Sequence, residues 1–128
     1  MNGIDHARRL IALALLDFQA MTNMLEPSMF SDSIFGFHAQ QAVEKTLKAW
    51  MCLNNQAYQG KHDLRLLLAQ LEKYGASSIE RFKDLADLTD FAVEYRYEIY
   101  NEEPVDRTEL IGKVSALIAH VNGQLDQK

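Results

Sequence analysis

Residues 31–53, SDSIFGFHAQQAVEKTLKAWMCL, decide the fold class of this protein. Ser31, Asp32 and Ser33 offer side-chain oxygens that can accept hydrogen bonds from the first free N–H groups of a helix. Apolar side chains then recur every three or four positions, which is the spacing of one buried helix face. This face comprises Phe35, Ala39, Ala42, Val43, Leu47 and Trp50. The stretch therefore predicts an amphipathic helix that ends near Leu53.

The same spacing predicts a helix upstream, over about residues 5–25, with Pro27 interrupting the pattern. Its core face comprises Ala7, Ile11, Ala14, Phe18, Met21 and Leu25. Leu10, Leu13 and Leu16 make this apolar stripe wider than a single core requires. The first helix is therefore expected to be covered on two sides, either at the centre of the bundle or at a subunit interface.

Downstream, Asp63 is placed to cap a short third helix that ends near Gly75. The inward residues of this helix are Leu64, Leu67, Leu68 and Leu71. Ser77 or Ser78 can open a fourth helix, which Pro104 would end. Its apolar residues alternate in steps of three and four, as in the seams of antiparallel bundles. They are Leu85, Leu88, Ala92, Tyr95 and Ile99.

Asp106, followed three residues later by Glu109, resembles a capping box that begins a fifth helix. The apolar face of this helix comprises Leu110, Val114, Leu117, Ile118, Val121 and Leu125. No segment alternates with the period of two that a half-buried strand would show. The sequence thus predicts a single all-α domain over residues 1–128, an up-and-down antiparallel helical bundle of four main helices plus one short helix.

Composition excludes several classes of protein. Apolar residues make up 48% of the 128 and charged residues 24%, which is typical of a globular domain rather than a disordered chain. The net charge is −5 and the basic residues are scattered, so no general electrostatic grip on nucleic acid is expected. A small local site for RNA or a nucleotide remains open.

The location of the protein and its need for a cofactor can also be predicted from simple features of the sequence. The longest apolar run, Ile11 to Leu16, is far shorter than the roughly 20 residues that span a bilayer, and no signal-peptide pattern is present. The single cysteine, Cys52, is expected to be a buried, unreactive thiol. The four histidines fall on separate segments, so no metal is expected. The six glycines are too far apart for a phosphate-loop or dinucleotide motif, so no other cofactor is expected. We expect a cytoplasmic protein with no membrane contact.

The second helix carries a polar stripe. Gln41, Glu44, Lys45 and Lys48 stand at positions i, i+3, i+4 and i+7, and Glu44 before Lys48 is the favourable order for an ion pair. The stripe is either a solvated surface or part of a binding site. His38, at the start of this stretch, is interpreted as an ordinary, partly exposed histidine.

Residues 94–104, EYRYEIYNEEP, place Arg96 on the flank of the buried face of the fourth helix. An arginine there buries its stem, and its guanidinium requires a carboxylate such as Glu44, a backbone carbonyl or an anionic ligand. Tyr97 and Tyr100 would add hydroxyl donors or a stacking surface. Both an internal ion pair and a ligand contact are consistent with this pattern.

Three segments in this order, FHAQQAVEKTLKAWM at 37–51, KHDLRLLLAQL at 61–71 and YRYE at 95–98, resemble the HEPN (higher eukaryotes and prokaryotes nucleotide-binding) domain family. The resemblance covers nearly the whole chain. It implies a small up-and-down helical bundle that is commonly a homodimer. It also implies frequent encoding beside a minimal nucleotidyltransferase, often as a toxin–antitoxin pair.

The resemblance further bears on catalysis. Toxic members of the family are metal-independent RNases that use an Arg-x(4–6)-His motif, and Arg96 matches its arginine. The histidine is missing, because positions 101 to 103 are Asn, Glu and Glu. Histidine suits RNA cleavage because it titrates near neutral pH, whereas Asn101 cannot exchange protons in this way.

Three hypotheses follow from the residues and the resemblance together. In the first, the chain is a non-catalytic module that dimerises and binds a nucleotide or a nucleotidyltransferase partner. The candidate ligand-binding residues are Arg96, Tyr97, Tyr100, Gln41, Glu44, Lys45 and Lys48. In the second, it is an RNase with a degenerate motif that uses Arg96 with Asn101 or a nearby glutamate. In the third, it is a purely structural interaction domain in which Glu44 neutralises Arg96.

Overall fold

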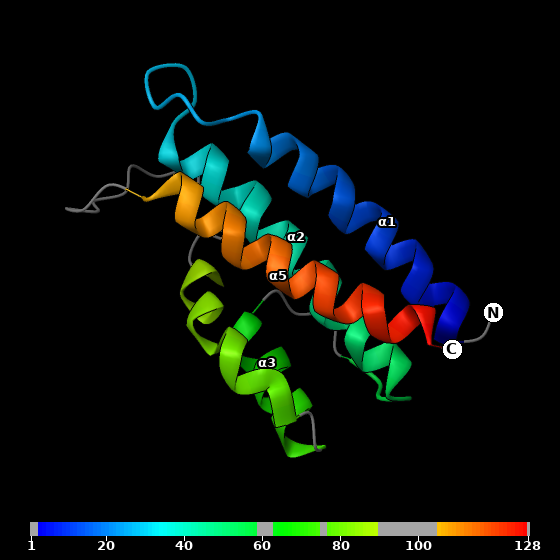
Figure 1. Cartoon of the computed structure of the whole chain (residues 1–128). Helices are drawn as coiled ribbons and strands as arrows, with labels where there is room; N and C mark the ends of the chain where they lie inside the picture. The colour runs from blue at the N-terminus through cyan, green and yellow to red at the C-terminus, as the bar shows by residue number, and fades with distance from the viewer. Residues whose placement is uncertain (1–2, 59–62, 75–76, 90–104, 128) are drawn as a thin grey trace.

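The computed structural model describes residues 3–58, 63–74, 77–89 and 105–127. These residues form α1 (Gly3–Thr22), α2 (Asp32–Leu53), α3 (Leu64–Lys73), the 3₁₀ helix η1 (Ser77–Leu88) and α5 (Arg107–Asp126). The part of the chain that is described contains no strand (Figure 1). The predicted all-α helical bundle is therefore confirmed.

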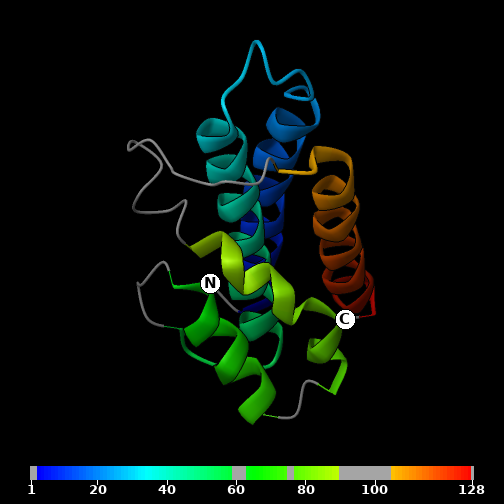
Figure 2. The same ribbon diagram turned by 90° about the vertical axis from the view of Figure 1, so that its left-hand side faces the viewer.

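The three long helices α1, α2 and α5 lie side by side and contact one another (Figure 1). α1 and α2 run in opposite directions, and α5 runs in the same direction as α2 (Figure 2). α3 and η1 pack on each other and lie against the half of α2 that includes its C-terminus. The core therefore lies around α2, between the long helices on one side and the α3–η1 pair on the other.

α2 is the central helix, because it contacts each of the other four helical elements. Its largest fully buried side chains are Phe35, Leu47, Trp50 and Met51. α1, in contrast, packs against α2 and α5 and leaves Leu13 and Leu16 exposed at 42% and 63%. Of the two alternatives for the wide stripe of the first helix, a central position is therefore wrong.

The first helix ends at Thr22 rather than at the predicted Leu25, which is 52% exposed. The hydroxyl of Thr22 and the amide of Asn23 both donate hydrogen bonds to the backbone oxygen of Gln19, at 2.8 and 2.9 Å. Side chains that bond to the backbone in this way compete with continuation of the helix. The spacing of apolar residues contains no information about these side-chain hydrogen bonds, so it did not predict the earlier end of the helix.

The predicted N-caps of the second, third and fifth helices are confirmed. Ser31 Oγ accepts a hydrogen bond from the N–H of Ile34 at 3.2 Å. Asp63 and Asp106 each accept from a backbone N–H two or three residues ahead, at 3.0 Å in both cases. Glu109 forms an ion pair with Lys113 at 3.3 Å. The third helix ends at Lys73, and the predicted stop at Gly75 lies outside the described residues.

The prediction of an α-helix is wrong for the first part of the fourth segment, which is a 3₁₀ helix. Ile79, Phe82, Leu85 and Leu88 recur at every third position, and each is at most 6% exposed. A helix with three residues per turn places such residues in a single line, whereas an α-helix would spread them around its surface. The remaining predicted seam residues, Ala92, Tyr95 and Ile99, fall outside the described residues.

Candidate functional site

The polar stripe of α2 is partly buried, so its interpretation as a solvated surface is wrong for Glu44, which is only 4% exposed. Lys48 Nζ donates to Glu44 Oε2 at 2.8 Å, which confirms the predicted ion pair. Gln40, which is fully buried, donates from Nε2 to Glu44 Oε1 at 2.8 Å. Gln41 Nε2 in turn donates to Gln40 Oε1 at 2.7 Å. A buried carboxylate requires partners of this kind, because removal from water otherwise disfavours its charge.

Lys48 is also held inside the fold. Its side chain is 12% exposed, and its ammonium lies 5.1 Å from the centre of the Tyr58 ring. The Tyr58 hydroxyl lies 2.6 Å from His6 Nε2 of α1. Burial, followed by the proximity of Cys52, raises the pKa of Tyr58 above its usual value, so the phenol stays protonated at neutral pH. The charge of Lys48 is therefore engaged by Glu44 and the tyrosine ring.

A second group of polar side chains joins α1 to α2. Asp17 of α1 accepts a hydrogen bond from His38 Nδ1 at 3.0 Å and another from Lys45 Nζ at 2.5 Å. The side chain of Asp17 is 14% exposed, whereas those of His38 and Lys45 are 28% and 26% exposed. We call these three residues the Asp17 cluster. His38 is thus partly exposed as predicted, but a carboxylate also orients its ring.

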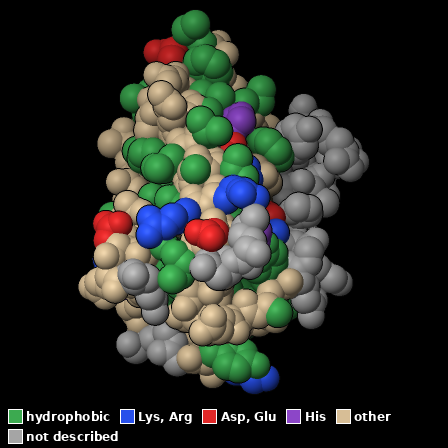
Figure 3. Space-filling model, turned by 90° about the vertical axis from the view of Figure 1, so that its right-hand side faces the viewer, with side chains coloured by type: hydrophobic (Ala, Val, Ile, Leu, Met, Phe, Trp, Pro, Cys, Tyr) green, Lys and Arg blue, Asp and Glu red, His purple; other side chains and the backbone are tan. Residues whose placement is uncertain are grey.

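Hydrophobic side chains gather on one outer face of the molecule, with basic side chains, acidic side chains and histidine among them (Figure 3). Asp17 is the only charged residue between Arg9 and Glu26, so it interrupts an otherwise uncharged stretch of sequence. This interruption is a sequence signal that could have identified Asp17 as a partner for a basic residue on another helix. No such signal marks Tyr58, which comes from the connection that follows α2.

Arg96, Tyr97, Tyr100 and Asn101, which the sequence singles out, lie outside the described residues. The predicted alternative of an Arg96–Glu44 ion pair lies outside them as well. Among the candidates that are described, the structure brings Gln41, Glu44 and Lys48 into one hydrogen-bonded network through Gln40. Lys45, on the same helix, belongs instead to the Asp17 cluster.

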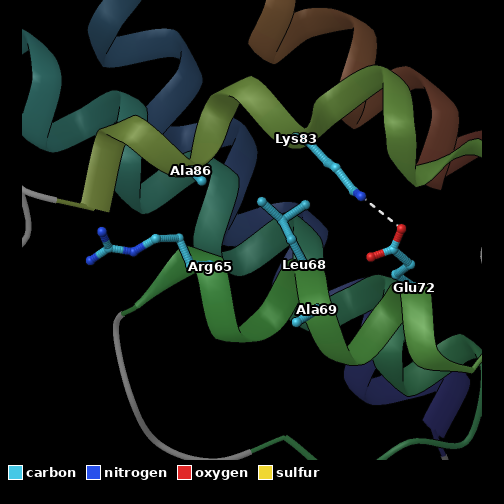
Figure 4. A pocket seen from close by; sticks show the side chains of 6 residues that line it. All are labelled: Arg65, Leu68, Ala69, Glu72, Lys83 and Ala86. Atoms are coloured by element: carbon cyan, nitrogen blue, oxygen red, sulfur yellow. Dashed lines mark hydrogen bonds and ion pairs between the residues drawn. The ribbon is translucent and has the colours of Figure 1, made fainter.

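A shallow groove of about 180 Å³ lies between α3 and η1 (Figure 4). Its floor is apolar, formed by Leu68, Ala69 and Ala86. The two cations at its edge, Arg65 and Lys83, each form ion pairs with carboxylates. Because these pairs already compensate the positive charge, the groove does not favour a phosphate.

Two further observations concern metals and membranes. The described residues contain no group of three His, Cys, Asp or Glu side chains that could hold a metal ion. None of the described helices is both long enough and apolar enough to cross a bilayer. Cys52 is only partly buried, so the prediction of a buried thiol is wrong. Its partial burial still raises the pKa of the thiol above the usual value.

The fold and the two polar groups along α1 and α2 define a small helical-bundle protein with a polar network built into its second helix. Residues 7–124 match the HEPN domain family, and the chain belongs to this family. Neither a search of curated proteins nor a search of solved structures found a match. The predicted family is therefore confirmed over nearly the whole chain.

Proposed function

We propose that this chain is a non-catalytic HEPN-type module that dimerises and binds a nucleotide, a partner minimal nucleotidyltransferase, or both, as in a toxin–antitoxin pair. Its membership of a nucleotide- and RNA-related family supports the general class of ligand. The Asp17 cluster supports the specific choice, because it holds a lysine and a histidine at partly exposed positions. Cations fixed in place by a carboxylate on another helix are preorganised to bind an anionic group.

In this proposal Arg96 is the anchor for the ligand. A guanidinium can bind a phosphate through two parallel hydrogen bonds, which a lysine cannot do. Tyr97 or Tyr100 stacks on the base of the nucleotide. The network of Gln41, Gln40, Glu44 and Lys48 fixes the side chains of α2 that the proposal assigns to the same site as Arg96.

The module is proposed to be non-catalytic because of its sequence at positions 101 to 103, which are Asn, Glu and Glu. RNA cleavage without a metal requires a group that exchanges protons near neutral pH at the place where RNases of the family have a histidine. A glutamate there would also repel the phosphate that has to be bound.

The proposal predicts that a nucleotide stabilises the folded protein. At a concentration of about 100 times Kd, a ligand that binds only the folded state adds about 2.7 kcal/mol to the free energy of unfolding. For a domain of this size, the midpoint of thermal unfolding would rise by several degrees. The measurement is thermal unfolding of the purified protein with and without ATP, and Arg96→Gln is expected to lose most of the stabilisation.

Arg81→Gln provides a matched control, because Arg81 is an exposed arginine on η1. Co-purification with the nucleotidyltransferase encoded next to the gene, if one is present, tests the protein partner. Absence of binding to both a nucleotide and this partner at sub-millimolar concentrations would refute the proposal.

A further inference from the structure

The Asp17 cluster retains hydrogen-bond donors that the described part of the chain does not use. A lysine ammonium carries three N–H groups, and Asp17 accepts one of those of Lys45. Asp17 also accepts the Nδ1–H of His38, so the second ring nitrogen, Nε2, is left for another partner. Within the described residues, neither His38 Nε2 nor the other N–H groups of Lys45 has a hydrogen-bond partner.

These donors lie along one line of α2. His38, Gln41 and Lys45 stand at i, i+3 and i+7, so their side chains project from the same helix face over two turns. Gln41 uses one N–H to bond Gln40, which leaves its second N–H in the same row. The arrangement presents several donors and a single carboxylate, Asp17, which lies on α1.

The charge of the cluster depends on His38. With a neutral imidazole, Lys45 and Asp17 cancel and the cluster has no net charge. With a protonated imidazole the net charge is +1, and Nε2 becomes a donor. Among the described residues, the charged groups that face His38 are Asp17 of α1 and Lys45 of α2.

We propose that the Asp17 cluster is a pH-gated phosphate site, in which a phosphate oxygen accepts hydrogen bonds from Lys45 Nζ and protonated His38 Nε2. Asp17 acts as a positioning residue, because it holds both cations and opposes the phosphate until His38 gains a proton. The inference rests on the proposed function and identifies which group of the nucleotide binds at which residues. Lys45 makes this contact, whereas Lys48 remains engaged by Glu44 and Tyr58.

The test is calorimetric titration of the full chain with ATP and with inorganic pyrophosphate, at about pH 5.5 and about pH 8, on either side of the range in which histidine titrates. We expect affinity to be roughly tenfold higher at the lower pH, the ratio that corresponds to about 1.4 kcal/mol. His38→Gln should remove this pH dependence, and Lys45→Met should weaken binding at both pH values. Protonation of ATP itself affects the wild type and His38→Gln equally. The ratio of the two affinities at each pH therefore reports the contribution of His38 alone.

Asp17→Asn is expected to strengthen phosphate binding, in contrast to Lys45→Met, which should weaken it. Without the carboxylate, the affinity for pyrophosphate should rise at about pH 8, because the negative charge that opposes the phosphate is gone. A purely structural role of Asp17 would not raise affinity. This variant also keeps the test decisive if Lys45→Met fails to fold.

Lys113→Met is the matched control, since it also removes a lysine that is paired with a carboxylate. It is expected to retain the pH dependence of the wild type. A short single-stranded RNA forms a second arm: binding of RNA without binding of ATP or pyrophosphate would identify a phosphodiester backbone as the source of the phosphate.

The outcomes separate this inference from the proposed function. If wild type binds ATP but His38→Gln, Lys45→Met and Asp17→Asn bind it equally well at both pH values, the phosphate is bound elsewhere and the inference is overturned. If wild type binds none of the three ligands at either pH, the proposed nucleotide binding itself is refuted.

Discussion

Arg107 is a buried arginine at the start of α5 whose two terminal nitrogens donate hydrogen bonds to residues far away in the sequence. Its Nη1 donates to the backbone oxygen of Met24 at 2.6 Å, and its Nη2 donates to Phe30 O and Asp32 Oδ1 at 2.7 and 2.8 Å. The guanidinium also lies 5.0 Å from the centre of the Phe35 ring. One buried side chain thus fastens the connection between α1 and α2 to the start of α5.

Sequence reasoning overlooked Arg107, although a signal was present. A positive charge in the first turn of a helix opposes the helix dipole, which favours carboxylates there. An arginine at that position therefore indicates another use for the charge. What the sequence does not show is where the carbonyls of Met24 and Phe30 lie, because they come from a connection more than 70 residues away.

Replacement of Arg107 by Met is predicted to lower the free energy of unfolding by about 2–4 kcal/mol, because it removes three hydrogen bonds from a buried, charged donor. Arg107→Lys keeps the charge but not the planar fork, so it should recover only part of the loss. Urea unfolding followed by the fluorescence of Trp50, the only tryptophan, measures the change.

Lys113, a partly exposed lysine that pairs with Asp84, serves as the comparison, and its replacement by Met should cost less than about 1 kcal/mol. Equal costs for Arg107→Met and Lys113→Met would contradict the view that Arg107 is a structural clamp.

At the scale of elements, one contact joins α2, η1 and α5. The centre of the His120 ring, on α5, lies 5.0 Å from the centre of the Trp50 ring and 5.5 Å from the centre of the Phe82 ring. Its Nε2 is within hydrogen-bond distance of Ser78 Oγ at 2.9 Å and Gln124 Nε2 at 3.1 Å. An unprotonated Nε2 can accept these hydrogen bonds, so the junction favours the neutral imidazole.

The junction predicts a dependence of stability on pH. Burial, followed by the charge of Arg81, lowers the pKa of His120 below its usual value of 6.5. Above that value His120 is neutral in both the folded and unfolded states, so its contribution is fully present. As the pH falls from 6.5 through the lower pKa of the folded state, the unfolded chain gains a proton first and stability is lost.

Urea unfolding at about pH 7.5 and about pH 5 would measure this loss, on either side of the usual pKa of histidine. His120→Gln cannot titrate and should show a smaller decrease in stability between the two pH values. His6→Gln tests the specificity, because His6 lies at the contact with Tyr58 instead. An unchanged pH dependence in His120→Gln would contradict the assignment.

At the scale of the whole molecule, the outer face of α1 exposes apolar side chains that do not contribute to the core. Leu13 and Leu16 are exposed at 42% and 63%, and Ala20 follows at the next step of the same helical line. Among the described elements, α2 and α5 pack on the other side of α1 and none covers this face. This face is the surface through which we propose that the module dimerises.

The replacement Leu16→Glu is therefore predicted to convert the proposed dimer into a folded monomer. A glutamate at this exposed position costs little in the monomer, but a charge in an apolar interface would cost several kcal/mol. Light scattering coupled to size-exclusion chromatography measures the mass, and circular dichroism confirms the fold.

Leu66→Glu is the matched control, because Leu66 is an exposed leucine on α3, at 48% exposure. It should leave the dimer intact. A monomeric wild-type protein would refute the proposed dimer, and disruption by both variants would show that the effect is not specific to α1.

Features that depend on short-range interactions were predictable from the sequence. The caps at Ser31, Asp63 and Asp106 and the Glu44–Lys48 pair join residues two to four positions apart, so both partners lie in one short segment. The family was also predictable, because each of its characteristic segments is a short continuous stretch of sequence. The 3₁₀ helix η1 was not predicted, because Leu85 and Leu88 were interpreted as the first step of the seam, and Ile79 and Phe82, which extend the period of three, were not included.

The partners of Lys45 and Lys48 in the candidate site were not predictable, because they depend on which segments pack together. The lysines of α2 were identified, but the sequence alone did not separate their roles, since Lys45 and Lys48 are three residues apart on one helix. The distinction comes from Asp17, which lies 28 residues from Lys45, and from Tyr58, which lies beyond the end of α2.

The sequence by itself determined the all-α class, because the apolar period and the caps act over one or two helical turns, and the resemblance of its three characteristic segments indicated the HEPN family. Only the tertiary structure decided that α2 is the central helix, that Glu44 is buried and that Asp17 joins His38 to Lys45. These features depend on contacts between residues far apart in the chain. Their energies are set by burial and by the charges brought together there, which no local pattern contains.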